Sequence, residues 1–199
     1  LRRQRQMCIR DSASGKSTVG RLLEQRGWPV LDADRYARDA LAPNSASACA
    51  VVARYGAVVG DASGLNRAEL ARIVFNNPVE RQWLEQLVHP LVRQRFQQEL
   101  QRLQNAPVVV LMVPLLFEAG LETLCSEVWL VDCEPQQQLN RLQRRNGLSE
   151  IEAQARLDAQ WPLERKRPLA DVVINNRGTV NELINQLNRY APPSPGTTS

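Results

Sequence analysis

Short apolar runs alternate with amphipathic stretches along most of this chain. The strongest runs, residues 107–113 and 127–132, are mostly apolar, as is typical of parallel strands that are buried on both faces. Shorter strand candidates are residues 28–31 and 171–176, and residues 7–12 stand where a further buried strand is expected. Strands that alternate with helices in this way predict an α/β fold, a doubly wound parallel five-stranded sheet.

Helical periodicity divides the chain into an insertion, a lid and a core. Helical patterns dominate residues 43–104 and interrupt the alternation, which predicts an inserted helical lobe that binds a substrate. The longest of these helices contains Pro90, which we expect to kink it. Two later helical patterns form a hairpin that we expect to act as a lid, at about residues 136–167. The core is then expected at residues 7–42 and 105–190.

The most informative motif is Ser14-Gly15-Lys16-Ser17-Thr18, which matches the second half of the phosphate-binding signature G-x-x-x-x-G-K-[ST]. Gly15 allows the backbone to approach a phosphate closely, and successive backbone N–H groups can then surround its oxygens. Lys16 is suited to reach the β- and γ-phosphates, and the Ser17 hydroxyl to bind Mg²⁺. The helix that follows would present its positive N-terminus to the same anion. A chance match at a helix start is the alternative for this motif taken alone.

Both ends of the chain fit the pattern less well. Arg10 replaces the first glycine of the signature, and Asp11 follows it. An arginine side chain is bulky for so tight a turn, and an aspartate places negative charge near the phosphate. We therefore expect residues 1–12 not to be native sequence, the alternative being a loop that has diverged.

Residues 191–199, rich in Pro, Ser and Thr, are expected to form a disordered tail.

Two carboxylates follow a strand candidate at its carboxyl end, where open α/β sheets bind their ligands. They belong to Asp32 and Asp34, and residues two apart on a strand point to the same face. One would orient or deprotonate an attacking hydroxyl, and the other would help to hold Mg²⁺ through water. The alternative is a solvated turn in which an aspartate caps the next helix.

Two clusters of basic residues belong to the predicted lid. Arg141 and Arg145 lie one turn apart on one helical face, and Arg165, Lys166 and Arg167 form the second cluster. Guanidinium groups on a lid that folds over a nucleotide would stabilise the charge of a transferring phosphoryl group. An ordinary solvated basic face is the alternative.

His89 and Glu118 are weaker candidates for a site. His89 is the only histidine, and its place before Pro90 on an apolar-faced helix is more typical of a structural residue than of a ligand. Glu118 ends an apolar strand run, which favours a position in the site and a simple strand-end charge equally.

Composition excludes several classes of function. The 25 basic and 21 acidic side chains give a net charge of +4, which fits phosphorylated ligands, but no basic run interleaves with aromatics, so nucleic-acid binding is not expected. The four cysteines show no C-x-x-C spacing, so we expect neither structural zinc nor a disulfide framework, and we expect a reducing cytoplasmic setting. No stretch approaches the roughly 18 consecutive apolar residues of a membrane span, and no secretory signal is visible.

An ordered set of short segments over nearly the whole chain resembles the dephospho-coenzyme A (dephospho-CoA) kinase family. Beyond the phosphate loop, the set includes Leu31-Asp32-Ala33-Asp34, Gly64-Leu65-Asn66-Arg67, His89-Pro90-Leu91-Val92, Val113-Pro114-Leu115-Leu116-Phe117-Glu118 and Ala170-Asp171-Val172-Val173-Ile174-Asn175-Asn176. Each segment is short, but their common order and spacing are specific to the family. The family has glycines where this chain has Arg10 and Asp11.

The resemblance implies a P-loop kinase that transfers the γ-phosphoryl group of ATP to the 3′-hydroxyl of dephospho-CoA, with Mg²⁺ as the cofactor. It implies that Asp34 is the general base or orients the hydroxyl, with Asp32 beside it, and that Lys16 and Arg141 also serve catalysis. The ATP-binding residues would be Ala13, Ser14, Gly15, Lys16, Ser17, Thr18, Arg141, Arg145, Asn175 and Asn176. The acceptor-binding residues would be Asp34, Arg67, His89, Pro90, Leu116 and Glu118.

Two other functions compete with this one. A related kinase of the nucleoside-monophosphate-kinase-like group would act on a different alcohol. A catalytically impaired nucleotide- or CoA-binding homologue would explain Arg10 and Asp11, although the intact Lys16, Ser17 and Asp34 oppose it. A monomer or a small homo-oligomer is expected in each case.

Overall fold

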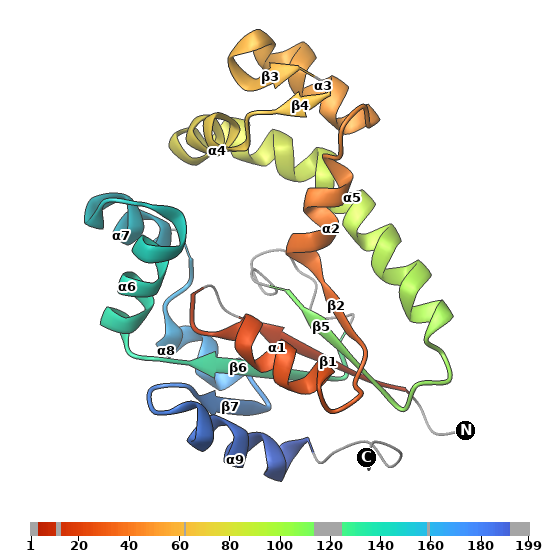
Figure 1. Cartoon of the computed structure of the whole chain (residues 1–199), viewed down its shortest axis with the longest axis vertical. Coiled ribbons are helices and arrows are strands. Elements are labelled where there is room, and N and C mark those ends of the chain that lie inside the picture. The colour runs from red at the N-terminus through yellow and green to blue at the C-terminus, as the bar shows by residue number, and fades with distance from the viewer. Residues whose placement is uncertain (1–3, 11–12, 62, 114–124, 159, 192–199) are drawn as a thin grey trace. The chain divides into compact units, whose positions relative to one another are not determined.

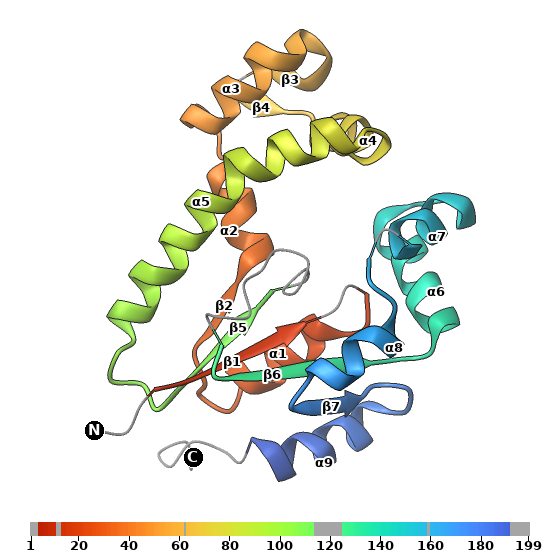
Figure 2. The same cartoon turned by 180° about the vertical axis from the view of Figure 1, so that it is seen from behind.

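The computed structural model describes residues 4–10, 13–61, 63–113, 125–158 and 160–191. The chain divides into two compact units, one of Leu1–Asp32 with Leu103–Ser199 and the other of Ala33–Arg102. Figures 1 and 2 show the elements of each unit from opposite sides. Within the described residues, no helix is both long and apolar enough to cross a membrane.

A five-stranded sheet forms the first unit, in the order β2-β5-β1-β6-β7, and every neighbouring pair is parallel. The strands are β1 (Arg5–Arg10), β2 (Val30–Asp32), β5 (Val108–Met112), β6 (Glu127–Asp132) and β7 (Val172–Asn175). The predicted α/β fold with a parallel five-stranded sheet is confirmed. Residues 5–10, within the segment predicted not to be native, form the central strand β1, and Met7, Cys8 and Ile9 are fully buried.

The helices of the first unit are α1 (Lys16–Glu24), α6 (Pro135–Asn146), α7 (Glu150–Asp158), α8 (Leu163–Lys166) and α9 (Val180–Tyr190), with a short 3-10 turn, η3 (Arg167–Leu169). Helices α1 and α9 share one apolar core with the sheet (Figure 1). Leu183 and Leu187 stand one turn apart on α9 and bury themselves in that core, because residues four apart share a helix face. Helices α6 and α7 form the predicted hairpin around Leu139, Leu142 and Ala153.

A buried tryptophan belongs to the apolar core of the sheet. Trp129 of β6 is fully buried and meets Tyr190 edge-on, at 5.9 Å between ring centroids. Its indole Nε1 donates to Glu127 Oε1 at 2.7 Å, which satisfies the one polar atom that the ring buries.

Helices dominate the second unit, which comprises α2 (Ala33–Ala40), α3 (Ala46–Tyr55), η1 (Gly56–Val59), β3 (Gly60–Asp61), β4 (Gly64–Leu65), α4 (Arg67–Asn76) and α5 (Pro78–Arg102). Helix α2 packs on α5, where Tyr36 and Phe96 lie edge to face with centroids 5.2 Å apart. Helix α5 contains Pro90 and bends part-way along its length (Figures 1 and 2), in line with the expected kink.

One expectation about the cysteines is wrong. The structure joins Cys8 to Cys125 by a disulfide, with Cα atoms 5.7 Å apart, although sequence spacing predicted none. Strand β6 runs parallel to β1, and Met7 pairs with Glu127, so the register brings these distant cysteines together. No local spacing pattern could record that pairing.

A polar cluster ties α3 to α5 in the second unit. Arg54 Nε and Nη2 donate to the two carboxylate oxygens of Glu80 at 2.6 and 3.0 Å, and the Tyr55 hydroxyl donates to Glu80 Oε2 at 2.7 Å. Arg54 also lies over the ring of Trp83, at 4.7 Å. The hydrogen bonds from Arg54, and to a smaller extent that from Tyr55, lower the pKa of Glu80 to about 2.

We predict that Glu80→Gln destabilises the protein mainly near neutral pH. Because the folded-state pKa of Glu80 lies below its ordinary value, its stabilisation is fully present above that value and is lost as pH falls toward about 2. Denaturant unfolding between about pH 7 and about pH 3 should therefore show a wild-type advantage that shrinks with acid. Glu85→Gln, on the same helix but outside the cluster, serves as the control. A difference for Glu80→Gln that does not change with pH would contradict the prediction.

Candidate active site

The phosphate-loop motif lies between a strand and a helix, as its chemistry requires. Strand β1 ends at Arg10 and α1 begins at Lys16, so the motif leaves the carboxyl end of the central strand. The oxygen of Gly15 accepts hydrogen bonds from the backbone N–H groups of Thr18 and Val19, at 2.9 and 3.1 Å, which start the helix. The N–H groups ahead of Thr18 come before the regular hydrogen-bonding pattern of the helix and point toward its start, which suits them to hold an anion.

Gly15 occupies a backbone conformation that glycine favours. Its φ is +104°, and a Cβ atom there would overlap the side-chain amide of Asn176 and lie 3.5 Å from Arg141 Nη1. A larger residue would therefore meet both strain and a clash. Lys16 is 6% exposed, and the neighbouring Ser17 is exposed.

The carbonyl of Ser14 joins three predicted parts of the site. It accepts hydrogen bonds from Asn176 Nδ2 at 2.6 Å and from Arg141 Nη1 at 2.9 Å. Ala13 packs against the apolar cluster of the α6–α7 hairpin. The structure thus brings together the phosphate loop, helix α6 of the predicted lid and the segment after β7, which are far apart in the sequence.

The two adjacent asparagines have different environments. Asn176 is buried, and its side chain reaches the phosphate loop. Asn175 is exposed, its side chain accepts from the backbone N–H of Arg177 at 3.0 Å, and its own backbone exchanges hydrogen bonds with Gln186 of α9. Arg145 lies exposed near the end of α6.

The strand argument for the two aspartates is wrong in its geometry. Strand β2 ends at Asp32, and Asp34 already lies in the first turn of α2. The alternation of side chains along a strand therefore does not extend to Asp34. An acidic side chain in that first turn interacts favourably with the helix dipole. Asp32 is half-buried and Asp34 is exposed.

The remaining acceptor-side candidates lie in the second unit or outside the described residues. Arg67 begins α4, and its Nη2 donates to the backbone oxygen of Arg38 at 3.3 Å. His89 is half-buried on α5 and shares a shallow hollow with the exposed Pro90. Leu116, Glu118 and also Asp11 lie outside the described residues.

The second basic cluster does not form one solvated face. Arg165 lies over the ring of Trp161 at 3.5 Å, and Lys166 is 1% exposed. Arg167 Nη2 pairs with Asp132 Oδ2 at 3.0 Å. These three neighbours therefore have separate environments, and Arg167 contacts the end of core strand β6.

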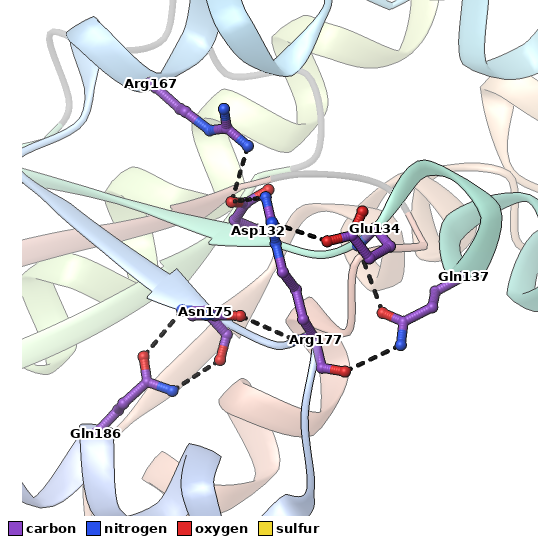
Figure 3. A network of polar contacts seen from close by, with 7 residues as sticks. All are labelled: Asp132, Glu134, Gln137, Arg167, Asn175, Arg177 and Gln186. Carbon is purple, nitrogen blue, oxygen red and sulfur yellow. Dashed lines mark hydrogen bonds and ion pairs between the residues drawn. The ribbon is translucent and has the colours of Figure 1, made fainter.

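Sequence reasoning missed a polar network around Asp132 (Figure 3). Asp132 ends β6, is 5% exposed and pairs through Oδ2 with both Arg167 and Arg177, each at 3.0 Å. Arg177 Nη1 also pairs with Glu134 Oε1 at 2.7 Å. The available signal was an aspartate at the carboxyl end of a buried strand, the same signal that singled out Asp32.

Comparison with known proteins identifies the family. The family model described as dephospho-CoA kinase matches residues 11–182. The chain belongs to this family. A curated relative from Parasynechococcus marenigrum, named dephospho-CoA kinase, is 62% identical over 186 residues, 94% of each chain. A relative of the same name from Gloeobacter violaceus is 46% identical and covers 89% of this chain and 86% of its own.

Solved structures agree with the family assignment. A crystal structure from Thermus thermophilus superposes with a TM-score of 0.80 at 38% identity, covering 94% of this chain and 96% of that one. Dephospho-CoA kinase from Campylobacter jejuni gives a TM-score of 0.67 at 26% identity, with 93% and 94% covered. The recognition made from the ordered segments is confirmed, and no comparison supports an impaired homologue.

We predict that Gly15→Ala weakens nucleotide binding by about tenfold or more, because a left-handed conformation costs a non-glycine residue about 1–2 kcal/mol. The overlap with Asn176 adds to that cost. Isothermal titration with ATP measures the loss. Gly147→Ala is the matched control, because Gly147 also has a positive φ, +63°, but has open space around its Cβ position. Equal losses in both variants would contradict a specific role for Gly15.

Proposed function

We propose that this chain is a dephospho-CoA kinase, which transfers the γ-phosphoryl group of ATP to the 3′-hydroxyl of dephospho-CoA. The products are CoA and ADP, and the reaction is the last step of CoA biosynthesis. The observation that carries the proposal is the family match over residues 11–182, within which the phosphate loop stands between the central strand and its helix. Phosphoryl transfer needs mainly positioning and charge stabilisation, which such a loop supplies.

The ATP side of the site is assigned to the phosphate loop and to the residues that contact it. Backbone N–H groups of residues 13–18 would bind the β- and γ-phosphates, with Lys16 adding its ammonium charge. Arg141 already reaches the loop at the Ser14 carbonyl, which supports a role beside the phosphates. Arg145 on the same helix and the segment at Asn175 and Asn176 complete the proposed ATP site.

Mg²⁺ is the proposed cofactor, as the kinase family implies a divalent metal with ATP. The chemistry of the available oxygen donors fits, because Mg²⁺ prefers oxygen ligands, retains several waters and is bound by few protein groups. The Ser17 hydroxyl is exposed at the start of α1, and the Asp32 carboxylate ends β2. Ser17 would bind the metal directly and Asp32 through water, and the metal would neutralise charge on the phosphates.

The acceptor side is assigned to Asp32, Asp34 and the helical unit. Asp34 would accept the proton of the 3′-hydroxyl while the oxygen of that hydroxyl forms a bond to the γ-phosphorus. The bond from that phosphorus to the bridging oxygen breaks, and ADP leaves with the electron pair. Further acceptor contacts are proposed for Arg67, His89, Pro90, Leu116 and Glu118. Residues 43–104 would act as the acceptor lobe and residues 136–167 as the lid.

The remaining proposals concern the setting of the enzyme. Small phosphorylated substrates, rather than nucleic acid, are its proposed partners. We propose a cytoplasmic location, since the substrates are intermediates of central biosynthesis, and a monomer or small homo-oligomer.

We predict that incubation with Mg·ATP and dephospho-CoA yields CoA and ADP, measured by chromatography of both products. Asp34→Asn and Lys16→Ala should each reduce kcat by about 100-fold or more, because each removes a group that acts on the reacting atoms. Asp39→Asn, on the same helix as Asp34, is the control and should retain activity. A chelator of divalent metals should abolish the activity of the wild-type protein.

A second pair of substitutions separates a faulty loop from a wrong substrate. If the chain forms no product, Arg10→Gly with Asp11→Gly should restore the reaction, which would place the fault in the loop. If that variant also forms no CoA, the proposed activity is overturned.

A further inference from the structure

The Asp132 carboxylate stands where the lid meets the nucleotide loop. Asp132 ends β6 just before Glu134, the residue that caps α6, so it marks the point where the lid leaves the core. Arg167, at the point where the lid returns, and Arg177, just after β7, both donate to Oδ2 at 3.0 Å (Figure 3). One carboxylate oxygen thus joins both ends of the lid to the loop after β7.

The same loop is fixed to the β6–α6 segment by backbone contacts. The N–H of Asn176 donates to the backbone oxygen of Asp132 at 2.6 Å. Gln137 Nε2 donates to the backbone oxygen of Arg177 at 3.0 Å. With the Asp132–Arg177 ion pair, these contacts hold residues 176 and 177 at three points, so the direction of the Asn176 side chain is determined.

Asn176 transmits that position to the phosphate loop. Its Nδ2 donates to the Ser14 carbonyl at 2.6 Å and occupies the space that a side chain at Gly15 would need. Hydrogen bonds that fix one carbonyl of a phosphate loop also restrict how the neighbouring N–H groups can point toward a phosphate. Arg141 donates to the same carbonyl from a partly exposed position on α6, whereas the Asn176 side chain is buried beside the loop.

The energetics favour a positioning role for this carboxylate. Asp132 Oδ1 is buried and has no hydrogen-bond partner among the described residues, and a buried charge with an unpaired oxygen is costly. Arg167 and Arg177 are each 39% exposed, so water can solvate both guanidinium groups when a substitution removes the carboxylate of Asp132. Neutralising Asp132 should therefore loosen the loop more than it unfolds the protein.

We propose that Asp132 is a positioning residue for the nucleotide site. It acts through Arg177 and Asn176 on the Ser14 carbonyl and so sets the shape of the phosphate loop. The inference rests on the proposed kinase function but can be tested by nucleotide binding alone, without turnover.

The test compares Asp132→Asn with Asn176→Ala and with the double variant. Both single variants should raise the Kd and KM for ATP about tenfold, the effect of losing a hydrogen bond to a charged or buried group. The KM for dephospho-CoA should stay within about twofold. Because the two residues act in series, the double variant should bind ATP no worse than Asn176→Ala alone.

Asp171→Asn is the matched control. Asp171 also accepts a hydrogen bond at β6, from the N–H of Val128 at 2.8 Å, but it lies beside the amino ends of β6 and β7. It should lower thermal stability without changing ATP affinity. The positioning role would be overturned if Asp132→Asn, like Asp171→Asn, lowered thermal stability without weakening ATP binding. It would also be overturned if the losses of ATP affinity in Asp132→Asn and Asn176→Ala added fully in the double variant.

Failure of the two proposals can be told apart. A wild-type chain that binds ATP but makes no CoA would overturn the proposed activity, while the ratios of ATP affinity would still decide the role of Asp132. A chain that binds no ATP, even with Arg10→Gly and Asp11→Gly, would overturn both.

Discussion

The hydrogen bonds to the Ser14 carbonyl connect the parts of the core that make up the proposed nucleotide site. Two donors, Asn176 Nδ2 and Arg141 Nη1, come from segments more than 100 residues further along the chain. A phosphate loop works only if its N–H groups converge, and convergence requires the carbonyls to be directed elsewhere. The left-handed Gly15 allows the close approach that these donors need.

The sheet explains why those donors arrive at the loop. Strand β1 lies between β5 and β6, and β7 lies beside β6, all parallel, so their carboxyl ends meet at one edge. The segments that follow β1, β6 and β7 carry the phosphate loop, the start of the proposed lid and Asn176. Such strands are held by apolar packing and by the backbone hydrogen bonds between them, which leaves the loops at their ends open to chemistry.

The second unit follows a different construction. Helices α2 and α5 pack through Tyr36 and Phe96, and α3 is tied to α5 by the Glu80 cluster. Asp34 stands in the first turn of α2, next to the point where the chain passes from one unit to the other. The proposed base thus belongs to a helix, so the geometry of α2 rather than the pleat of a strand sets the direction in which it leaves the backbone.

The sequence by itself determined the α/β class, the phosphate loop and the family, because each is recorded in contiguous residues or in their order. Buried strands showed as apolar runs, and Lys16 and Ser17 were identified by a local signature. Only the tertiary structure decided that Asn176 holds Ser14, that Asp132 gathers two arginines, and that Cys8 meets Cys125. These contacts depend on strand order and register, and no local pattern encodes which distant strands become neighbours. The strand argument failed at Asp34 for a related reason, since the exact residue where β2 gives way to α2 is set by packing in three dimensions.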